Sequence, residues 1–532
     1  MISISSFFQR YFTPAVRKRL RINAAFATAV VVALHLVHPY NIPWLVEKED
    51  AAMDSVMRLF RNLPTGKHED HEDAFVLVEA DQDAYEEWKQ PFYFDRKRVA
   101  GLINEVARGK PKMIIVDIDL STGDKDTVTC EDKDGVEDPG PCYVDSTKEL
   151  KSAIEKYDEI EDRDEKEPIP PLILVRTLAP FSEGRPDSKL LPQRKSFLDD
   201  EVREAPSVFW ASPHFQQDSD YRIRRWHLWM PTCTDEVMSV LPSVQLLAQR
   251  LLLKEPGSYE EKYESLINKQ LMPIAAKRFA SEVNQCSRRD DADPSDVVDS
   301  IKTTLEINGD FIIDLATEEL LSQRLIYRIP YDTEEFARPN VDINGRSAPV
   351  LDRISARHFF DGADPNLTDR VDSELFEDRI VIIGGTFRET RDWHTTPAGE
   401  MPGVMVIVNA IDSLGNHGQF HSPGILLKLL LAAVSVLVIS VSFALFDNLF
   451  AKVICLVLIM VIAQPVAFWL FPDGAWLNVA LPAMVMGLSE IAYDFQELRN
   501  PLRDETADNV TDGVVHRAFY FLRTTTTGRR RD

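Results

Sequence analysis

The sequence predicts an α/β fold: a mostly parallel extracytoplasmic sheet with flanking helices and two insertions, attached to four transmembrane α-helices. Residues 75–119 read as a strand, a helix and a second strand, and residues 379–385 read as a β-branched strand that ends in two glycines. Apolar stretches near both ends of the chain predict the membrane helices. One large α/β domain is therefore expected between membrane segments.

The N-terminal segment predicts a membrane anchor. Residues 1–22 hold five basic residues and no acidic ones, and an apolar stretch that ends near Trp44 follows them. We expect a cytoplasmic leader at residues 1–21 and a transmembrane helix at 22–45, with the following residues outside. A cleaved signal peptide is the alternative, but no small-residue cleavage site follows the apolar stretch.

Residues 46–421 are the predicted extracytoplasmic domain. Its expected elements are strands at 75–81, 113–119, 171–176 and 379–385, and helices at 95–108 and 354–362. The first strand, helix and second strand form a βαβ unit, and such crossovers are parallel and right-handed in nearly all cases.

Two polar stretches read as insertions in this domain. Residues 121–170 hold seventeen acidic and seven basic residues, and residues 254–310 are polar and helical in character. We interpret the first as a solvated surface segment. A calcium-binding loop is the alternative, but the regular Asp spacing and central Gly of an EF-hand are missing.

The C-terminal part predicts a hairpin array of membrane helices. Transmembrane helices are expected at 425–446, 453–471 and 476–493, followed by a cytoplasmic tail at 494–532. Four crossings return the chain to its starting side, so both termini are expected in the cytoplasm. Glu490 is costly in lipid, so it either serves a function or lies close to the interface.

Composition excludes one class of partner and leaves the redox state open. A formal net charge of -25 without a basic face in the domain argues against nucleic-acid binding. The four cysteines of the domain suit an oxidising compartment, although an even number also arises by chance. The nearest-neighbour pairing among three is Cys130 with Cys142 and Cys233 with Cys286.

Several blocks of this chain occur in the order of a known family. Residues 379–412 contain Ile-Gly-Gly, Asp392, Thr-Pro-x-Gly, Met-Pro-Gly-Val and Asn-Ala-Ile-Asp. Residues 52–61, the βαβ unit, an Asp-x-x-x-Arg turn at Asp220 and a Pro-Ser-led helix at 242–248 precede them. The order resembles the type 2 CHASE domain, an extracellular sensory domain of bacterial receptors. This chain has Val408 where the family usually keeps a His, and Tyr221 where glycine is usual.

The candidate ligand-binding residues follow strand ends. In open parallel sheets the ligand crevice lies beyond the carboxyl ends of the strands. The residues expected at or just after such ends are Asp81, Asp117, Asp119, Gly384, Gly385 and Asp392. Paired carboxylates there could bind a cation or an amine, and the alternative is that they cap turns and helices.

No other pattern gives a specific chemical site. The two glycines could present N–H groups to an anion, but they lack the Lys of a P-loop and favour a tight turn. The spacing of His394, His417 and His421 matches no known metal site. No catalytic residue, metal ligand or cofactor is predicted, and no nucleophile elbow is present.

The resemblance implies a sensor in the bacterial inner membrane, with its large domain in the periplasm or outside. We expect it to bind membrane lipid and an unidentified extracytoplasmic ligand, and to signal through a separate cytoplasmic or membrane output protein, because the tail is too short for an output domain. A homodimer is left open. The alternative is a non-catalytic structural or assembly subunit that uses the sensor fold as a docking surface.

Overall fold

The computed structural model divides into two compact units, Met57–Phe420 on one side and Met1–Val56 with His421–Asp532 on the other. The residues that it describes are 14–36, 43–60, 73–89, 94–121, 146–159, 169–178, 190–234, 237–253, 257–279, 303–307, 311–332, 338–343, 346–360, 373–445, 450, 453–454, 457, 464–471 and 474–476.

The unit Met57–Phe420 is built on a six-stranded sheet in the order β14-β1-β15-β2-β3-β5. All neighbouring strands run parallel, which confirms the predicted sheet. In sequence order the strands are β1 (Phe75–Ala80), β2 (Met113–Asp117), β3 (Leu172–Val175), β5 (Val208–Ala211), β14 (Leu351–Ser355) and β15 (Ile380–Gly385). The late strand β15 lies between β1 and β2, so the crossover from β1 to β2 spans one intervening strand.

Helices cover both faces of this sheet because its side chains alternate between two apolar cores. Phe75 and Leu77 of β1 belong to the core that contains α8 (Val244–Leu252) and α12 (Gly403–His417). Val76 and Val78 belong to the other core. The helices of that second core are α5 (Arg96–Arg108), α6 (Ser146–Glu155) and α7 (Asp199–Glu204).

The residues of the predicted insertions contribute to these cores. Helix α6 lies within residues 121–170, and its Leu150 and Ile154 are buried. Within residues 254–310 the described elements are α9 (Tyr259–Glu264), a π-helix (Ser265–Leu271), α10 (Met272–Arg278) and β10 (Thr304–Ile307). Leu271 and Ile307 pack in the core of α8 and α12. Parts of both segments are thus integral to the fold.

The prediction of a helix at residues 354–362 was wrong. Leu351–Ser355 forms β14, which pairs with β1, and only a 3₁₀ turn follows at Ala356–Phe359. The predicted strand ends at 81, 119 and 176 lie one or two residues beyond the observed ends. Residues 361–362 lie outside the described residues.

Shorter elements surround the sheet. The helices are α4 (Gln82–Glu87) and 3₁₀ turns at Tyr157–Glu159, Ser373–Leu375 and Arg388–Thr390. The strands are β4 (Leu191–Pro192), β6 (Phe215–Gln217), β7 (Ile223–Trp226), β8 (Trp229–Thr234), β9 (Val237–Pro242), β11 (Phe311–Asp314), β12 (Asn340–Ile343), β13 (Arg346–Pro349), β16 (Trp393–Thr396) and β17 (Gly399–Pro402).

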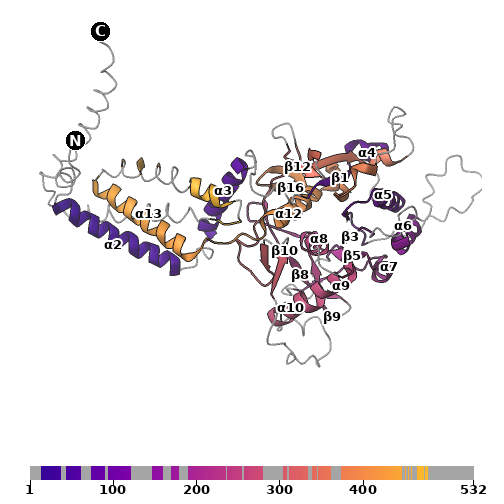
Figure 1. Ribbon diagram of the computed structural model, residues 1–532, viewed down its shortest axis with the longest axis horizontal. Coiled ribbons are helices and arrows are strands. Elements are labelled where there is room, and N and C mark those ends of the chain that lie inside the picture. The colour runs from indigo at the N-terminus through magenta and orange to yellow at the C-terminus, as the bar shows by residue number, and fades with distance from the viewer. Residues whose placement is uncertain are drawn as a thin grey trace, which may run out of the picture. The chain divides into compact units, whose positions relative to one another are not determined.

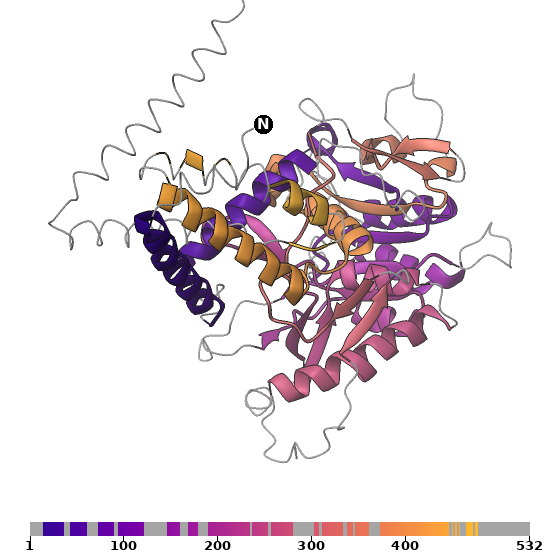
Figure 2. The same cartoon turned by 60° about the vertical axis from the view of Figure 1, so that its left-hand side comes forward.

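Helices make up the other unit. They are α2 (Pro14–Leu36), α3 (Pro43–Phe60, which continues into Met57–Phe420), α13 (Ile425–Leu445) and α15 (Gln464–Leu470). Helices α2 and α13 lie side by side, as Figures 1 and 2 both show. Within the described ranges, no helix has the length and apolar character needed to cross a membrane. The four predicted spans therefore stay predictions; most of 476–493 and all of 494–532 lie outside the described residues.

Cys233 in β8 is disulfide-bonded. Cys130, Cys142 and Cys286 lie outside the described residues. The predicted pairing of Cys233 with Cys286 stays a prediction, as does that of Cys130 with Cys142.

Candidate functional site

Three residues of neighbouring strands form one row at the carboxyl edge of the sheet. Glu79 of β1 is aligned with Gly384 of β15, and Gly384 is aligned with Asp117 of β2. The alternation of side chains places this row on the face that α12 covers. Strand β15 thus separates the carboxylates of Glu79 and Asp117, and its residue between them is Gly384.

The absence of a side chain at Gly384 lets α12 approach the sheet. A Cβ atom at Gly384 would lie 2.9 Å from Val404 Cγ2 and 3.5 Å from Asp117 Cβ. Gly385 fits the following turn, where its Cβ would lie 3.0 Å from Thr390 Cγ2. The β15 glycines therefore bring the start of α12 close to Asp117.

We expect Gly384→Ala to lower the free energy of unfolding by about 1 to 3 kcal/mol, because the added methyl group overpacks a site where the stiff Val404 side chain cannot yield. Urea unfolding of the detergent-solubilised protein measures this change. Gly424→Ala is the matched control, because no atom lies within 4 Å of its Cβ position. Equal stability of the two variants would contradict the close-approach argument.

Asp392 supplies a second carboxylate beside Asp117. The backbone N–H of Gly403, the first residue of α12, donates to the backbone carbonyl of Asp392 at 2.7 Å. The Asp392 side chain is half-exposed, and its Oδ1 lies 2.8 Å from His394 Nε2. These contacts fix Asp392 at the N-terminus of α12, next to the strand row.

The pair gives Asp117 unusual proton chemistry. Burial at the strand end, together with the negative charge of Asp392, raises the pKa of Asp117 to about 8. Among the described residues, no side-chain hydrogen bond or ion pair to the Asp117 carboxyl is present to offset this cost. A carboxyl in this state can donate a hydrogen bond near neutral pH, or release its proton when a cation arrives.

The other two predicted acids have local structural roles. Asp81 caps α4 by accepting from the Ala84 N–H at 2.8 Å, and it also accepts from Ser355 Oγ at 2.9 Å. Asp119 accepts from Ser121 N at 2.9 Å and from Thr177 Oγ1 at 3.0 Å. Burial alone would raise the pKa of Asp119, but hydrogen bonds from Ser121 and Thr177 outweigh it and lower the pKa. Asp117, Gly384 and Asp392 are thus the predicted residues that the fold brings together.

Glu79 also lies in the row at the carboxyl edge of the sheet, although the sequence did not identify it as a site residue. Its carboxylate, 4 % exposed, accepts from Arg353 Nε at 2.8 Å and Nη2 at 2.9 Å, and from Thr386 Oγ1 at 2.8 Å. The Tyr331 ring packs under the Arg353 guanidinium and meets the Trp393 ring edge-on. An acid inside an otherwise apolar strand was the available signal, because a buried carboxylate requires a partner.

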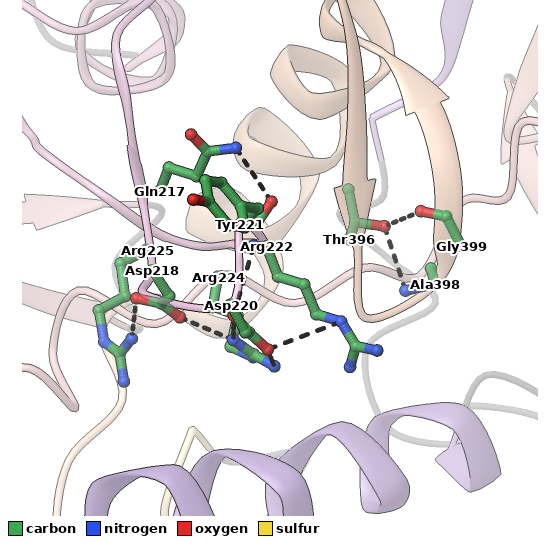
Figure 3. Close-up of polar contacts among 10 residues, drawn as sticks. All are labelled: Gln217, Asp218, Asp220, Tyr221, Arg222, Arg224, Arg225, Thr396, Ala398 and Gly399. Carbon is green, nitrogen blue, oxygen red and sulfur yellow. Dashed lines mark hydrogen bonds and ion pairs between the residues drawn. The ribbon is translucent and has the colours of Figure 1, made fainter. Parts of the chain in front are cut away.

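The turn between β6 and β7 supports the hairpin that carries Asp392 (Figure 3). Asp220 binds Arg224 through two hydrogen bonds of 2.7 Å, and Asp218 accepts from the same guanidinium at 2.9 Å. Beyond the turn, Arg222 forms a parallel bridge with Thr395 of β16. The Asp-x-x-x-Arg block therefore contacts the strand that contains Trp393 and His394.

Tyr221 adopts a left-handed backbone conformation in this turn, with φ of 62°, and its side chain is 75 % exposed. Glycine adopts this conformation without cost, whereas tyrosine is strained. Hydrogen bonds from Tyr221 N to Asp218 O and from Gln217 Nε2 to Tyr221 O hold the turn (Figure 3). A bulky ring is thus presented to solvent from a rigid turn.

The Asn-Ala-Ile-Asp block fastens α12 to a neighbouring extended segment. Asp412 pairs with Arg328 through bonds of 2.6 and 3.1 Å, and both side chains are buried. The Asn409 amide exchanges two hydrogen bonds with the backbone of Ile329. Val408, which replaces the usual His, is fully buried in the core.

The three histidines do not converge. His394 contacts Asp392, His417 is buried at the end of α12, and His421 belongs to the other unit. Within the part of the chain that the structure describes, no group of three or more His, Cys, Asp and Glu side chains could hold a metal ion.

Comparison with known protein families gives a match over most of the chain. The CHASE2 domain matches residues 26–446, about four fifths of the chain. The chain belongs to the CHASE2 domain family. CHASE2 domains are sensory, which supports a role in sensing or signalling in general. No curated protein and no solved structure matches this CHASE2 chain.

Proposed function

We propose that this CHASE2 protein is an integral membrane sensor that detects an extracytoplasmic ligand or envelope state and passes it through transmembrane helices to a separate partner. It acts without catalysing a reaction itself. The observation that carries the proposal is the Asp117 and Asp392 pair, held between a glycine strand end and the N-terminus of α12.

The proposed ligand is a cation or a protonated amine. A positive group beside Asp117 and Asp392 would favour their ionised forms, so binding would release the proton that burial keeps on Asp117. The energy for a response would come from different affinities for two states of the domain. Gly384, Gly385, Asp81 and Asp119 border the proposed pocket along the same strand ends.

Features of α2 and α13 support the proposed membrane location. The exposed apolar side chains of α13 include Leu426, Leu430, Val434 and Leu437, which recur at helical spacing along one stripe. Arg17, Lys18 and Arg21 at the start of α2 are exposed and suit anionic lipid headgroups. We place the chain in a bacterial inner membrane, with both termini cytoplasmic and the sheet outside; the Cys233 disulfide suits that compartment.

A second function is favoured by Tyr221. A strained, solvent-exposed aromatic residue on a rigid turn is typical of a docking surface. In this alternative the chain is a non-catalytic assembly subunit, and the sensor fold binds another protein or a second copy of the chain.

Affinity purification of the intact protein in mild detergent, followed by mass spectrometry, separates the two functions. For a sensor we expect a co-purifying kinase, cyclase or regulator, whose output changes in Asp117→Asn/Asp392→Asn while its recovery does not. The control is Asp200→Asn, at an exposed surface position. A stoichiometric envelope complex without a signalling enzyme, recovered equally with the double variant, would replace the sensor by the assembly subunit.

A further inference from the structure

The chain passes between its two units at two places. One is inside α3, after Val56, and the other follows Phe420, four residues before α13 begins at Ile425. Any change in Met57–Phe420 that reaches the other unit through the backbone must cross one of these connections. The side chains that hold the two connections within the unit Met1–Val56 and His421–Asp532 could therefore transmit such a change.

Residues 474–476 contact Glu49 of α3, which lies before the first connection, and His421, which begins the second. We call Glu49, His421 and residues 474–476 the Trp476 clamp. The indole N–H of Trp476 donates to Glu49 Oε1 of α3. The Trp476 backbone N–H donates to the His421 carbonyl at 3.0 Å, and the His421 N–H donates to the Gly474 carbonyl at 2.9 Å. All five residues belong to the same compact unit.

The clamp is buried and its geometry is fixed locally. Trp476 is 1 % exposed and Glu49 is 4 % exposed. Gly474, with φ of 65°, turns the chain after α15, and its N–H donates to the Phe471 carbonyl at 3.1 Å. The rings of Phe471 and Trp476 meet edge-to-face at 6.2 Å. The indole N–H and its acceptor are thus both withdrawn from solvent.

Continuous helices lead to the clamp from both connections. Helix α3 is uninterrupted from Pro43 to Phe60, so it carries a displacement of its last turn to Glu49 as a rigid rod. Helix α12 begins at Gly403, whose N–H binds Asp392, and ends at His417, four residues before His421. Between them, Gln419 exchanges two hydrogen bonds with the backbone of Asp314.

We propose that the Trp476 clamp is the coupling device of this protein: it ties the chain leaving α12 to α3, so that a change at the start of α12 reaches both connections as one movement. This inference rests on the proposed sensor function, and it adds the residues through which the signal leaves the domain. Coupling between sites is reciprocal, so breaking the clamp must also alter the domain.

Hydrogen exchange of the full-length protein in mild detergent tests this directly. Trp476→Phe keeps the buried ring and removes the donor to Glu49. We expect about 2- to 10-fold faster exchange at the ends of α3 and α12 inside Met57–Phe420, the range given by the loss of one hydrogen bond. Trp469→Phe, at a 64 % exposed position of α15, is the matched control and should exchange like the unmodified chain.

A second pair of variants keeps the test decisive if Trp476→Phe weakens folding. Glu49→Gln retains an acceptor and should resemble the unmodified chain, whereas Glu49→Leu should reproduce Trp476→Phe, with no further increase in the double variant. Faster exchange confined to residues 43–56 and 464–476 would overturn the coupling role. Such a result would leave the sensor proposal standing, because that depends on the output of Asp117→Asn/Asp392→Asn.

Discussion

Asp412→Ala is expected to lower the free energy of unfolding by about 3 to 5 kcal/mol, the largest stability effect that we predict. Arg328 would keep its buried guanidinium but lose both of its hydrogen bonds to Asp412 Oδ1 and Oδ2. Asn416 Nδ2, 2.9 Å from the same carboxylate, would lose an acceptor as well. Urea unfolding followed by tryptophan fluorescence measures the change, because Trp226 in the same unit is fully buried.

Two further variants distinguish this cost from a general effect of removing acids. Glu400→Ala breaks the exposed ion pair with Arg388 and should cost less than about 1 kcal/mol. Arg328→Met combined with Asp412→Leu should recover part of the lost stability, since no unpaired charge remains buried. If the double variant is less stable than Asp412→Ala, the cost of Asp412→Ala does not come from leaving Arg328 buried and unpaired.

Local sequence patterns predicted the elements of the sheet better than their order. The βαβ unit at residues 75–119 has strong strand and helix periodicity, and Asp95 caps α5 as expected. The position of β15 between β1 and β2 depends on pairing across 267 residues of sequence to β2 (Met113 with Ile380) and 305 to β1 (Phe75 with Ile380), which no local pattern encodes. Residues 354–355, which end β14, were predicted as the start of a helix, because a short apolar pattern fits both periods.

The sequence indicates site residues that lie near strand ends, but not those whose partners are distant in sequence. Acids at the ends of parallel strands converge at one sheet edge, and Asp117 lies at that edge beside Gly384. Asp392 follows β15, the strand that lies between β1 and β2, whereas Asp81 and Asp119 bind the nearest backbone and hydroxyl donors. Glu79 escaped notice because its partner Arg353 lies 274 residues away in sequence.

The proton on Asp117 makes the folded protein less stable as the pH rises, which is the opposite of the effect of most acidic residues. Its ordinary pKa is 3.8, and in the folded chain burial, with the Asp392 charge, raises the pKa to about 8. Between these pH values the folded state holds a proton that the unfolded state has lost. Raising the pH through this window therefore lowers the free energy of unfolding, whereas salt-bridged acids stabilise a protein as pH rises.

We expect Asp117→Asn to remove this pH dependence and to be more stable than the unmodified chain above about pH 8, by roughly 2 to 4 kcal/mol. Asparagine keeps the shape of the protonated acid and cannot ionise, so the cost of a buried charge beside Asp392 disappears. Unfolding of the detergent-solubilised protein at several pH values, compared between the two chains, isolates Asp117 from other titrating groups such as His214 and His227, whose pKa values burial lowers.

Asp392→Asn measures the effect of the neighbouring charge, because Asp117 can still titrate in this variant. Removal of the neighbouring charge should lower the pKa of Asp117 without restoring its ordinary value, since burial is the larger cause. The fall in stability should then be smaller and should end at a lower pH than in the unmodified chain. If Asp117→Asn is less stable than the unmodified chain at every pH, the carboxyl is ionised and partnered in the folded protein, and the proton-release account of ligand binding fails with it.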